Sequence, residues 1–346
     1  MLGGRTHTKY FMKHFQRHKL FYAYLAAILL IILAVTVGIL FGATRISLFD
    51  GIGSLISGEA DSSDGRILLY VRLPRVLGGL LCGCALALSG AVLQGVLANK
   101  LASPSIIGVN SGAGLAVTLC AAFGIVGGTA LSVCAFVGAL VAVVLVSLGA
   151  KKWNASRSSV ILMGVALNAL LGAIDRAVVT FAPTVSMTTN DFKVGDLSSV
   201  TYEKLLPAAI MIAVGSVLIF TLSNELELLT LGEENARGRG LHASAVRAVF
   251  LLLCALLAGA AVSVTGLLSF VGLLVPHAVR RVSGSGAGHQ LPLCALFGAG
   301  FVSLCDTLSR IIFAPYELPV GIIMAFIGAP FFLFILLNGK GGKKHA

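Results

Sequence analysis

Runs of apolar residues, separated by short polar segments, fill almost the whole chain. A helix needs about 20 mostly apolar residues to cross a bilayer. Runs close to this length lie at residues 20–41, 76–97, 106–123, 126–148, 160–181, 205–222, 291–312 and 318–337. Each is therefore expected to form one membrane-spanning helix.

The uncharged stretch between Arg247 and Arg280 can be divided in two ways. It forms either one span with an interfacial tail, or a full span at 248–268 followed by a short half-helix at 270–279. Lys and Arg accumulate on the cytoplasmic side of a membrane protein. Only the second division keeps Arg280 and the lysine-rich C-terminus on the same side as most other basic residues. The sequence therefore predicts ten spans with both termini in the cytoplasm.

The polar segments between the spans are too short to form separate domains. The sequence thus predicts a single transmembrane domain over residues 20–338. It is flanked by a basic cytoplasmic N-terminus (1–19) and a basic cytoplasmic tail (339–346), with external loops at 42–75 and 182–204 and a cytoplasmic loop at 223–247.

Composition supports an all-α integral membrane protein. Hydrophobic residues make up 57% of the chain and charged residues 11%, too few polar side chains to cover a water-soluble globule of 346 residues. The net charge of +11 follows the predicted membrane sidedness, so it does not indicate a nucleic-acid partner.

The chain lacks both the motif of an ATPase and the common motifs of hydrolytic enzymes. It contains no G-x-x-x-x-G-K-[ST] phosphate loop, no H-E-x-x-H motif and no G-x-S-x-G elbow. We therefore expect no catalytic residue and no metal site. His277 follows Pro276, where a structural role at a helix end is expected in preference to metal binding.

Several long motifs occur in a fixed order. They read RLPRVLGGLLCGCALALSGAVLQGVLANKLASPSIIGVNSGA from Arg72, TGLLSFVGLLVPHAVR (265–280), HQLPLCALFGAG (289–300), DTLSR (306–310) and ELPVGIIMAFIGAPFF (317–332). Together they resemble the signature of the FecCD-type permease family, which imports iron-siderophores, haem and cobalamin. The resemblance covers roughly residues 70–337.

The resemblance implies the bundle of a cobalamin-importer permease (a type II ABC importer) in the cytoplasmic, or inner, membrane of a prokaryote. The implied partners are a second copy or a paralogue, two ABC ATPase subunits and an external substrate-binding protein. ATP and Mg would bind the ATPase, and no cofactor would bind this chain. The implied function is ATP-driven import of an iron chelate, first of all an iron-siderophore, by alternating access. The alternatives are import of haem or cobalamin by the same mechanism, or a secondary transporter driven by an ion gradient.

The cytoplasmic loop could form short helices broken at its glycines. By resemblance it would be the segment that couples the permease to the ATPase, and the alternative is a solvated amphipathic loop. The expected coupling residues are Leu231, Gly232, Glu233, Glu234, Ala236, Arg237 and Gly240.

By resemblance, Arg72, Arg75 and Arg310 would dock the substrate-binding protein at the outer face. Two alternatives remain open. The arginines could snorkel to the headgroups, or Arg310 could pair internally with Asp306 four residues earlier on the same helix.

The remaining expected roles concern the translocation path and the helix framework. Candidates for the path are Ser89, Gln94, Asn99, Ser111 and Gly112. Candidates for structural roles are Pro74, Pro104, Gly272, Pro276, His277, Asp306, Pro319, Gly321 and Pro330.

Overall fold

The computed structural model describes residues 4–44, 47, 53, 62–153, 155–284 and 286–339. Within these ranges all of the regular structure is helical. The helices are α1 (Gly4–Leu40), α3 (Ser63–Ile67), the π-helix η1 (Leu68–Arg72), α4 (Leu73–Val96), α5 (Val109–Ala122), α6 (Gly128–Lys152), α7 (Arg157–Phe181), α8 (Thr184–Val194), α9 (Tyr202–Thr221), α10 (Ser223–Thr230), α11 (Glu233–Gly238), α12 (Ala243–Thr265), α13 (Val271–Ser283), α14 (Ala287–Ile311) and α15 (Val320–Gly339).

Each of the predicted spans contains one helix. Among the described residues, seven helical segments are long and apolar enough to cross a membrane: those containing α1, α4, α6, α7, α9, α12 and α14. Shorter apolar helices lie at Val109–Ala122 and Val320–Phe334. The stretch between Arg247 and Arg280 forms a full helix, α12, followed by the short α13. The predicted division into a span and a half-helix is confirmed.

Two of the predicted polar segments contain helix. Within the predicted external loop 42–75, α3, η1 and the start of α4 belong to one continuous helical segment from Ser63 to Val96. The polar N-terminus is helical from Gly4, as part of α1. Residues 45, 46, 48–52 and 54–61 of the external loop and residues 340–346 of the basic tail lie outside the described residues.

Pro74 explains the π-helix in front of α4. A proline inside an α-helix lacks the N–H for the ladder and its ring crowds the carbonyl four residues earlier. Here Pro74 lies in the first turn of α4, and the preceding turn has widened, with Leu73 N–H bonded to the carbonyl of Leu68 five residues back. The wider turn lets the helix continue through the proline.

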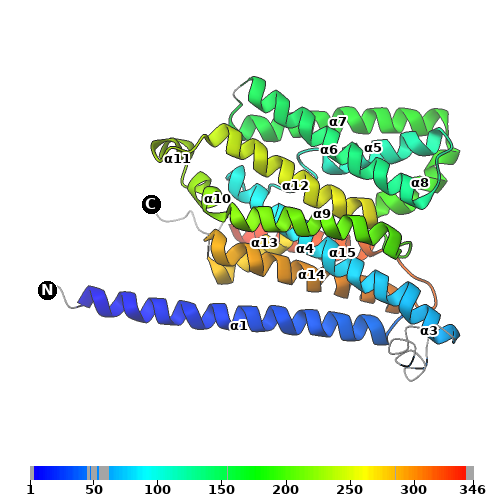
Figure 1. Ribbon diagram of the computed structural model, residues 1–346, viewed down its shortest axis with the longest axis horizontal. Helices are drawn as coiled ribbons and strands as arrows, with labels where there is room; N and C mark the ends of the chain where they lie inside the picture. The colour runs from blue at the N-terminus through cyan, green and yellow to red at the C-terminus, as the bar shows by residue number, and fades with distance from the viewer. Residues whose placement is uncertain are drawn as a thin grey trace.

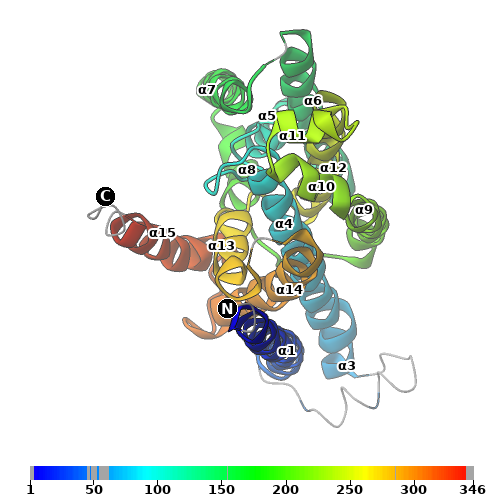
Figure 2. The ribbon, with the colours of Figure 1, turned by 90° about the vertical axis from the view of Figure 1, so that its left-hand side faces the viewer.

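The core of the bundle consists of α4, α12 and α14. The most apolar segments of these helices are 78%, 72% and 67% buried, compared with 22% for α1 and 11% for α7. α4 packs against α12, α13 and α14, while α1 covers α14 and α7 covers α5. Figure 1 shows α1 and α7 on opposite edges of the bundle, and Figure 2 shows α15 extending away from the central helices.

Glycines allow the core helices to approach each other closely. A Cβ atom at Gly90 of α4 would overlap the backbone of Gly272 in α13, and one at Gly83 would overlap the backbone of Gly298 in α14. Membrane helices associate by close packing, because lipid tails leave no hydrophobic force between them. The role expected for Gly272 follows from this contact.

The bundle has two ends of different character, which we name by their short helices. At the α10 end lie α10, α11 and the start of α1; at the other, the α8 end, lie α3 and one terminus of α8 (Figure 1). The predicted breaks between the short helices are confirmed, because Gly232 and Gly240 adopt positive φ angles of 106° and 83°. Such angles favour glycine strongly.

Candidate functional site

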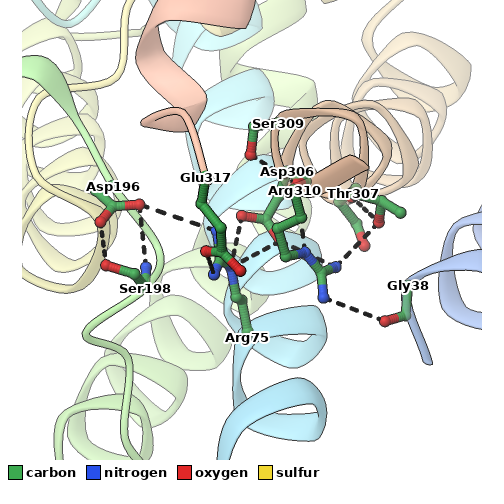
Figure 3. A network of polar contacts seen from close by, with 10 residues as sticks. Gly38, Arg75, Asp196, Ser198, Asp306, Thr307, Ser309, Arg310 and Glu317 are labelled. Atoms are coloured by element: carbon green, nitrogen blue, oxygen red, sulfur yellow. Dashed lines mark hydrogen bonds and ion pairs between the residues drawn. The ribbon is translucent and has the colours of Figure 1, made fainter. Parts of the chain in front are cut away.

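Charged side chains from distant parts of the sequence meet at the α8 end. We call Arg75, Asp196, Asp306, Arg310 and Glu317 the ionic cluster (Figure 3). Arg75 Nε donates to both carboxylate oxygens of Asp306, at 2.9 and 3.1 Å, and its Nη1 donates to Glu317 Oε2 at 2.6 Å. Arg310 Nη2 lies 3.2 Å from Asp306 Oδ2. One buried carboxylate therefore holds two arginines.

The ionic cluster connects four parts of the bundle. Arg75 belongs to α4, Asp306 and Arg310 to α14, and Glu317 to the connection between α14 and α15. Asp196, between α8 and α9, lies 4.0 Å from Arg75 Nη2. Because burial of an ion is unfavourable unless it is paired, this arrangement fixes both connections relative to the core helices.

Two arginines bind the carboxyl end of α1. Arg72 Nη1 donates to the carbonyls of Ile39 and Leu40 at 2.6 and 2.9 Å. Arg310 Nη1 lies 3.3 Å from the carbonyl of Gly38. The last carbonyls of a helix have no partner within the helix and carry partial negative charge. The guanidinium groups supply the missing donors and fasten α1 to α4 and α14.

The arginines expected to dock a partner protein, Arg72, Arg75 and Arg310, are not available for direct contact with one in this structure. Arg72, Arg75 and Arg310 are 3%, 3% and 2% exposed, and each donates hydrogen bonds to groups of the same chain. The internal pair of Arg310 with Asp306 is present. The sequence places these residues near helix ends, but it does not show the carbonyls and carboxylates that distant elements bring around them.

At the other end, α10 is anchored to the core. Leu226 and Leu229 are buried, and α10 packs against α4 and α14. Arg157, at the start of α7, donates through Nη2 to the carbonyl of Leu229 at 2.7 Å. The helix is therefore held both by apolar contacts and by a cap on its carboxyl end.

The expected coupling residues divide by exposure. Leu231 is 52% exposed and Gly240 is exposed, whereas Ala236 is buried. α11 contains Glu233, Glu234 and Arg237, whose side chains lie outside the described residues. The α10 end thus presents a pair of short helices. Their buried apolar residues face the bundle, and Leu231 between them is exposed.

Gln94 compensates for a proline in a neighbouring helix. Pro276 has no N–H, so the carbonyl of Gly272, four residues earlier, lacks its usual partner in α13. Gln94 Nε2 of α4 donates to this carbonyl at 3.2 Å, and Gln94 Oε1 accepts from Arg280 Nη2 at 3.3 Å. Gln94 is 3% exposed and both ends of its amide group are engaged, so it contributes to the packing of α4 against α13.

This contact predicts the effect of replacing Gln94. Gln94→Leu should leave the Gly272 carbonyl buried without a donor and lower the free energy of unfolding by about 1–3 kcal/mol. Pro276→Ala restores the missing N–H and should recover part of the loss in the Gln94→Leu background. The midpoint of thermal unfolding of the purified protein in detergent measures both variants. Equal losses with and without Pro276→Ala would contradict this account.

Two further path candidates are packing residues. Ser89 is fully buried and donates to the carbonyl of Leu86 in its own helix at 3.0 Å. Gly112 is buried where α5 meets α6, and a Cβ there would overlap the backbone of Gly138. Asn99 and Ser111 are partly exposed, and Asn99 accepts from the N–H of Leu101 at 2.9 Å, which shapes the turn after α4.

The expectation for His277 needs correction. α13 continues through Pro276 to Ser283, so His277 lies within the helix and not at its end. Its ring packs edge-on against Phe331 of α15, with ring centroids 6.4 Å apart. The helix continues because Gln94 replaces the hydrogen bond that Pro276 removes.

The other structural candidates lie at contacts between elements. Pro104 lies beside Gly272, where an added Cβ atom would be 3.1 Å from Pro104 Cδ. Pro319 directly precedes α15, and Pro330 lies inside that helix. Gly321 N–H donates to the carbonyl of Gly195 at 3.0 Å, and a side chain at Gly321 would overlap the Val194 carbonyl. The start of α15 is thus joined to the end of α8.

A second site of charged side chains joins α7 to α8, and the sequence did not identify the partner of its acid, Asp175. Lys193 Nζ of α8 lies 2.7 Å from Asp175 Oδ2 of α7, and Thr118 Oγ1 of α5 donates to Asp175 Oδ1 at 2.6 Å. Asn168 Nδ2 of α7 donates to the carbonyl of Ser105 at 2.9 Å. An acid within an apolar span is expected to be paired, and this was the available signal for Asp175.

Comparisons with known proteins agree with this architecture. A model of the FecCD transport family matches residues 28–338. The Fe(3+)-citrate import system permease protein YfmE of Bacillus subtilis (strain 168) is 36% identical over 313 residues, 90% of this chain and 93% of its own length. The cobalamin import system permease protein BtuC of Halobacterium salinarum is 37% identical over 267 residues, 77% of this chain and 72% of its own.

A solved structure has the same fold. It is a metal-chelate type ABC transporter in an inward-facing conformation, with a TM-score of 0.80 and 29% identity, and the match covers 91% of this chain and 98% of that one. Taken with the match of the family model over most of the chain, these likenesses show that the protein belongs to the FecCD transport family and is the membrane-spanning permease of an ABC importer for iron chelates, haem or cobalamin.

Proposed function

We propose that this permease imports iron chelates, with an iron-siderophore as the first candidate and haem and cobalamin as alternatives. The 36% identity to an iron-citrate permease and the fold shared with a metal-chelate transporter support the proposal. A cobalamin permease is 37% identical over a shorter stretch of 267 residues, so identity alone does not choose the substrate.

The observation that carries the mechanism is the anchored helix pair at the α10 end. ATPase subunits, which would carry ATP and Mg, would bind α10 and α11 there. α10 is buried along Leu226 and Leu229 and capped by Arg157. A displacement of α10 would therefore be transmitted to α4, α7 and α14. Closure of the ATPase pair would in this way switch the permease between outward and inward access.

The path is proposed to form between two copies of the chain, or between the chain and a paralogue. The core helices are closely packed, whereas α7 is only 11% buried in its most apolar segment and α15 extends away from the central helices (Figure 2). Membrane helices bring small residues to their interfaces, and α7 carries Ala166, Ala169, Gly172 and Ala173. A substrate-binding protein would deliver the chelate at the α8 end, on the outer side of a prokaryotic inner membrane.

Uptake into proteoliposomes tests the substrate and the energy source. The chain is reconstituted with its ATPase and binding protein and offered iron-siderophores, iron citrate, haem and cobalamin. ATP-dependent accumulation of an iron-siderophore is the expected result. Accumulation of haem or cobalamin alone would assign the alternative substrate. Transport that needs an ion gradient and not ATP would overturn the proposal.

The turn between α10 and α11 offers the sharpest variant. Gly232→Pro requires φ near −65° where the chain has +106°, and it removes the N–H that donates to Leu229. ATP-dependent uptake should be lost while the permease still assembles with the ATPase. Gly238→Ala is the matched control, because a Cβ there meets nothing within 4 Å. Wild-type uptake by Gly232→Pro would contradict the coupling role.

A further inference from the structure

A pocket with charged and amide side chains in its lining lies at the α10 end, bounded by the end of α4 and by α10, α13 and α14. Its volume is about 420 Å³. The polar side chains in its lining are Gln94, Lys100, Glu227, Thr230, Arg280 and Gln290. Two of these are cationic and one is anionic, so the pocket carries an excess positive charge.

Two hydrogen-bond donors of this pocket have no acceptor. Arg280 is held against the wall by its bond from Nη2 to Gln94 Oε1, yet its Nε is buried without a partner among the described residues. The same holds for Nε2 of Gln290, a residue that is only 6% exposed. Buried donors are normally satisfied, which indicates that an acceptor completes this site.

The charge of the pocket points to an anionic acceptor. Within the described part of the chain, neither Arg280 nor Lys100 forms an ion pair. Glu227 of α10 lines the pocket and is exposed. An oxyanion with several oxygens can accept from Arg280 and Gln290 together, and hydrogen bonds to a charged group are about twice as strong as neutral ones.

We propose that this pocket binds a phosphate group, with Arg280 Nε and Gln290 Nε2 donating to its oxygens and Lys100 adding positive charge. The phosphate group belongs either to inorganic phosphate or to the headgroup of an anionic lipid. Because Glu227 carries the same charge as the ligand, it opposes binding. The site would therefore join α13, α14 and the end of α4 through the bound group, beside α10.

The consequence for transport rests on the proposed function, in which α10 transmits the movement of the ATPase. A bound phosphate group would hold α4, α13 and α14 together beside α10 and repel Glu227. Occupancy would then set how firmly α10 stays against the bundle. The binding site itself depends only on the geometry of the pocket.

Equilibrium binding of radiolabelled inorganic phosphate tests the site. The purified complex of permease and ATPase is delipidated in detergent and titrated at constant ionic strength. Saturable binding is expected, and Arg280→Gln and Gln290→Leu should each weaken it about tenfold or more. Glu227→Gln should tighten it severalfold. Arg281→Gln is the matched control, because Arg281 is exposed and outside the lining, and it should bind as the wild type does.

Reconstitution in nanodiscs separates the two sources of the phosphate group. If a lipid headgroup is the natural occupant, inorganic phosphate should bind more weakly in discs that contain phosphatidylglycerol than in pure phosphatidylcholine. Native mass spectrometry should then show a retained anionic lipid that Gln290→Leu loses.

Two results would overturn the proposal. One is the absence of both saturable phosphate binding and a retained anionic lipid. The other is an equal loss of affinity in Arg281→Gln and Arg280→Gln, which would show diffuse electrostatic attraction without a site. No transport substrate enters these measurements, so they stand or fall separately from the substrate assignment.

Discussion

Replacing Asp306 with asparagine is expected to lower the free energy of unfolding by about 3–5 kcal/mol, the range for removing one partner of a buried ion pair. Asp306 is 1% exposed and binds both Arg75 and Arg310. The variant leaves these two buried cations with less negative charge nearby. Because Arg310 also binds the end of α1 and Arg75 binds Glu317, the loss should extend to the contacts of α1 and of the connection to α15.

The buried cysteines give a direct measurement of this effect. Cys82, Cys254 and Cys294 are fully buried free thiols, so a thiol-reactive fluorophore reports thermal unfolding in detergent. Glu203→Gln is the control, because Glu203 is an exposed acid in the first turn of α9 and loses the same charge. A midpoint for Asp306→Asn equal to that of Glu203→Gln would contradict the role of the ionic cluster.

Gly90→Ala should separate α4 from α13 and destabilise the bundle by about 1–3 kcal/mol or more, as overpacking of a close contact does. The added methyl group would overlap the backbone of Gly272, which cannot move aside as a flexible side chain can. Displacement of α13 would also lengthen the bond between Gln94 and the Gly272 carbonyl.

Gly114→Ala is the matched control for this substitution. Gly114 is a buried glycine inside α5, but a Cβ there would lie 3.6 Å from Leu267 Cδ1, an ordinary van der Waals contact. Since alanine favours helix over glycine by up to about 1 kcal/mol, this variant should be neutral or slightly more stable. The same thiol-reactive assay measures both. The close-packing argument fails if both glycines tolerate alanine equally.

The sequence predicted local features well, because local physical chemistry controls them. An apolar run of about 20 residues satisfies its own backbone only as a helix in lipid, and each predicted span contains a helix. Gly232 and Gly240 break α10 from α11 and α11 from α12, as their lack of a Cβ allows. Pro74 and Pro276 were recognised as special positions, but their neighbours decided whether the helix continued.

The interpretation of the arginines shows what the sequence left open. Arg72, Arg75 and Arg310 were expected to face a partner protein, and the structure buries all three. Arg75 finds its carboxylate 231 residues away in the sequence, and Arg72 finds the carbonyls of α1 more than 30 residues earlier. No local pattern contains these pairings.

The sequence by itself determined that this is an integral membrane protein with its helices in a given order, because apolar length and glycine breaks act within one segment. Its motifs indicated a permease only through their resemblance to a family. Only the tertiary structure decided which polar groups face each other. Gln94 became the partner of a carbonyl 178 residues away, and a pocket with unsatisfied donors formed beside α10. Such contacts depend on how separate helices pack, and packing is a property of the whole bundle and not of any one segment.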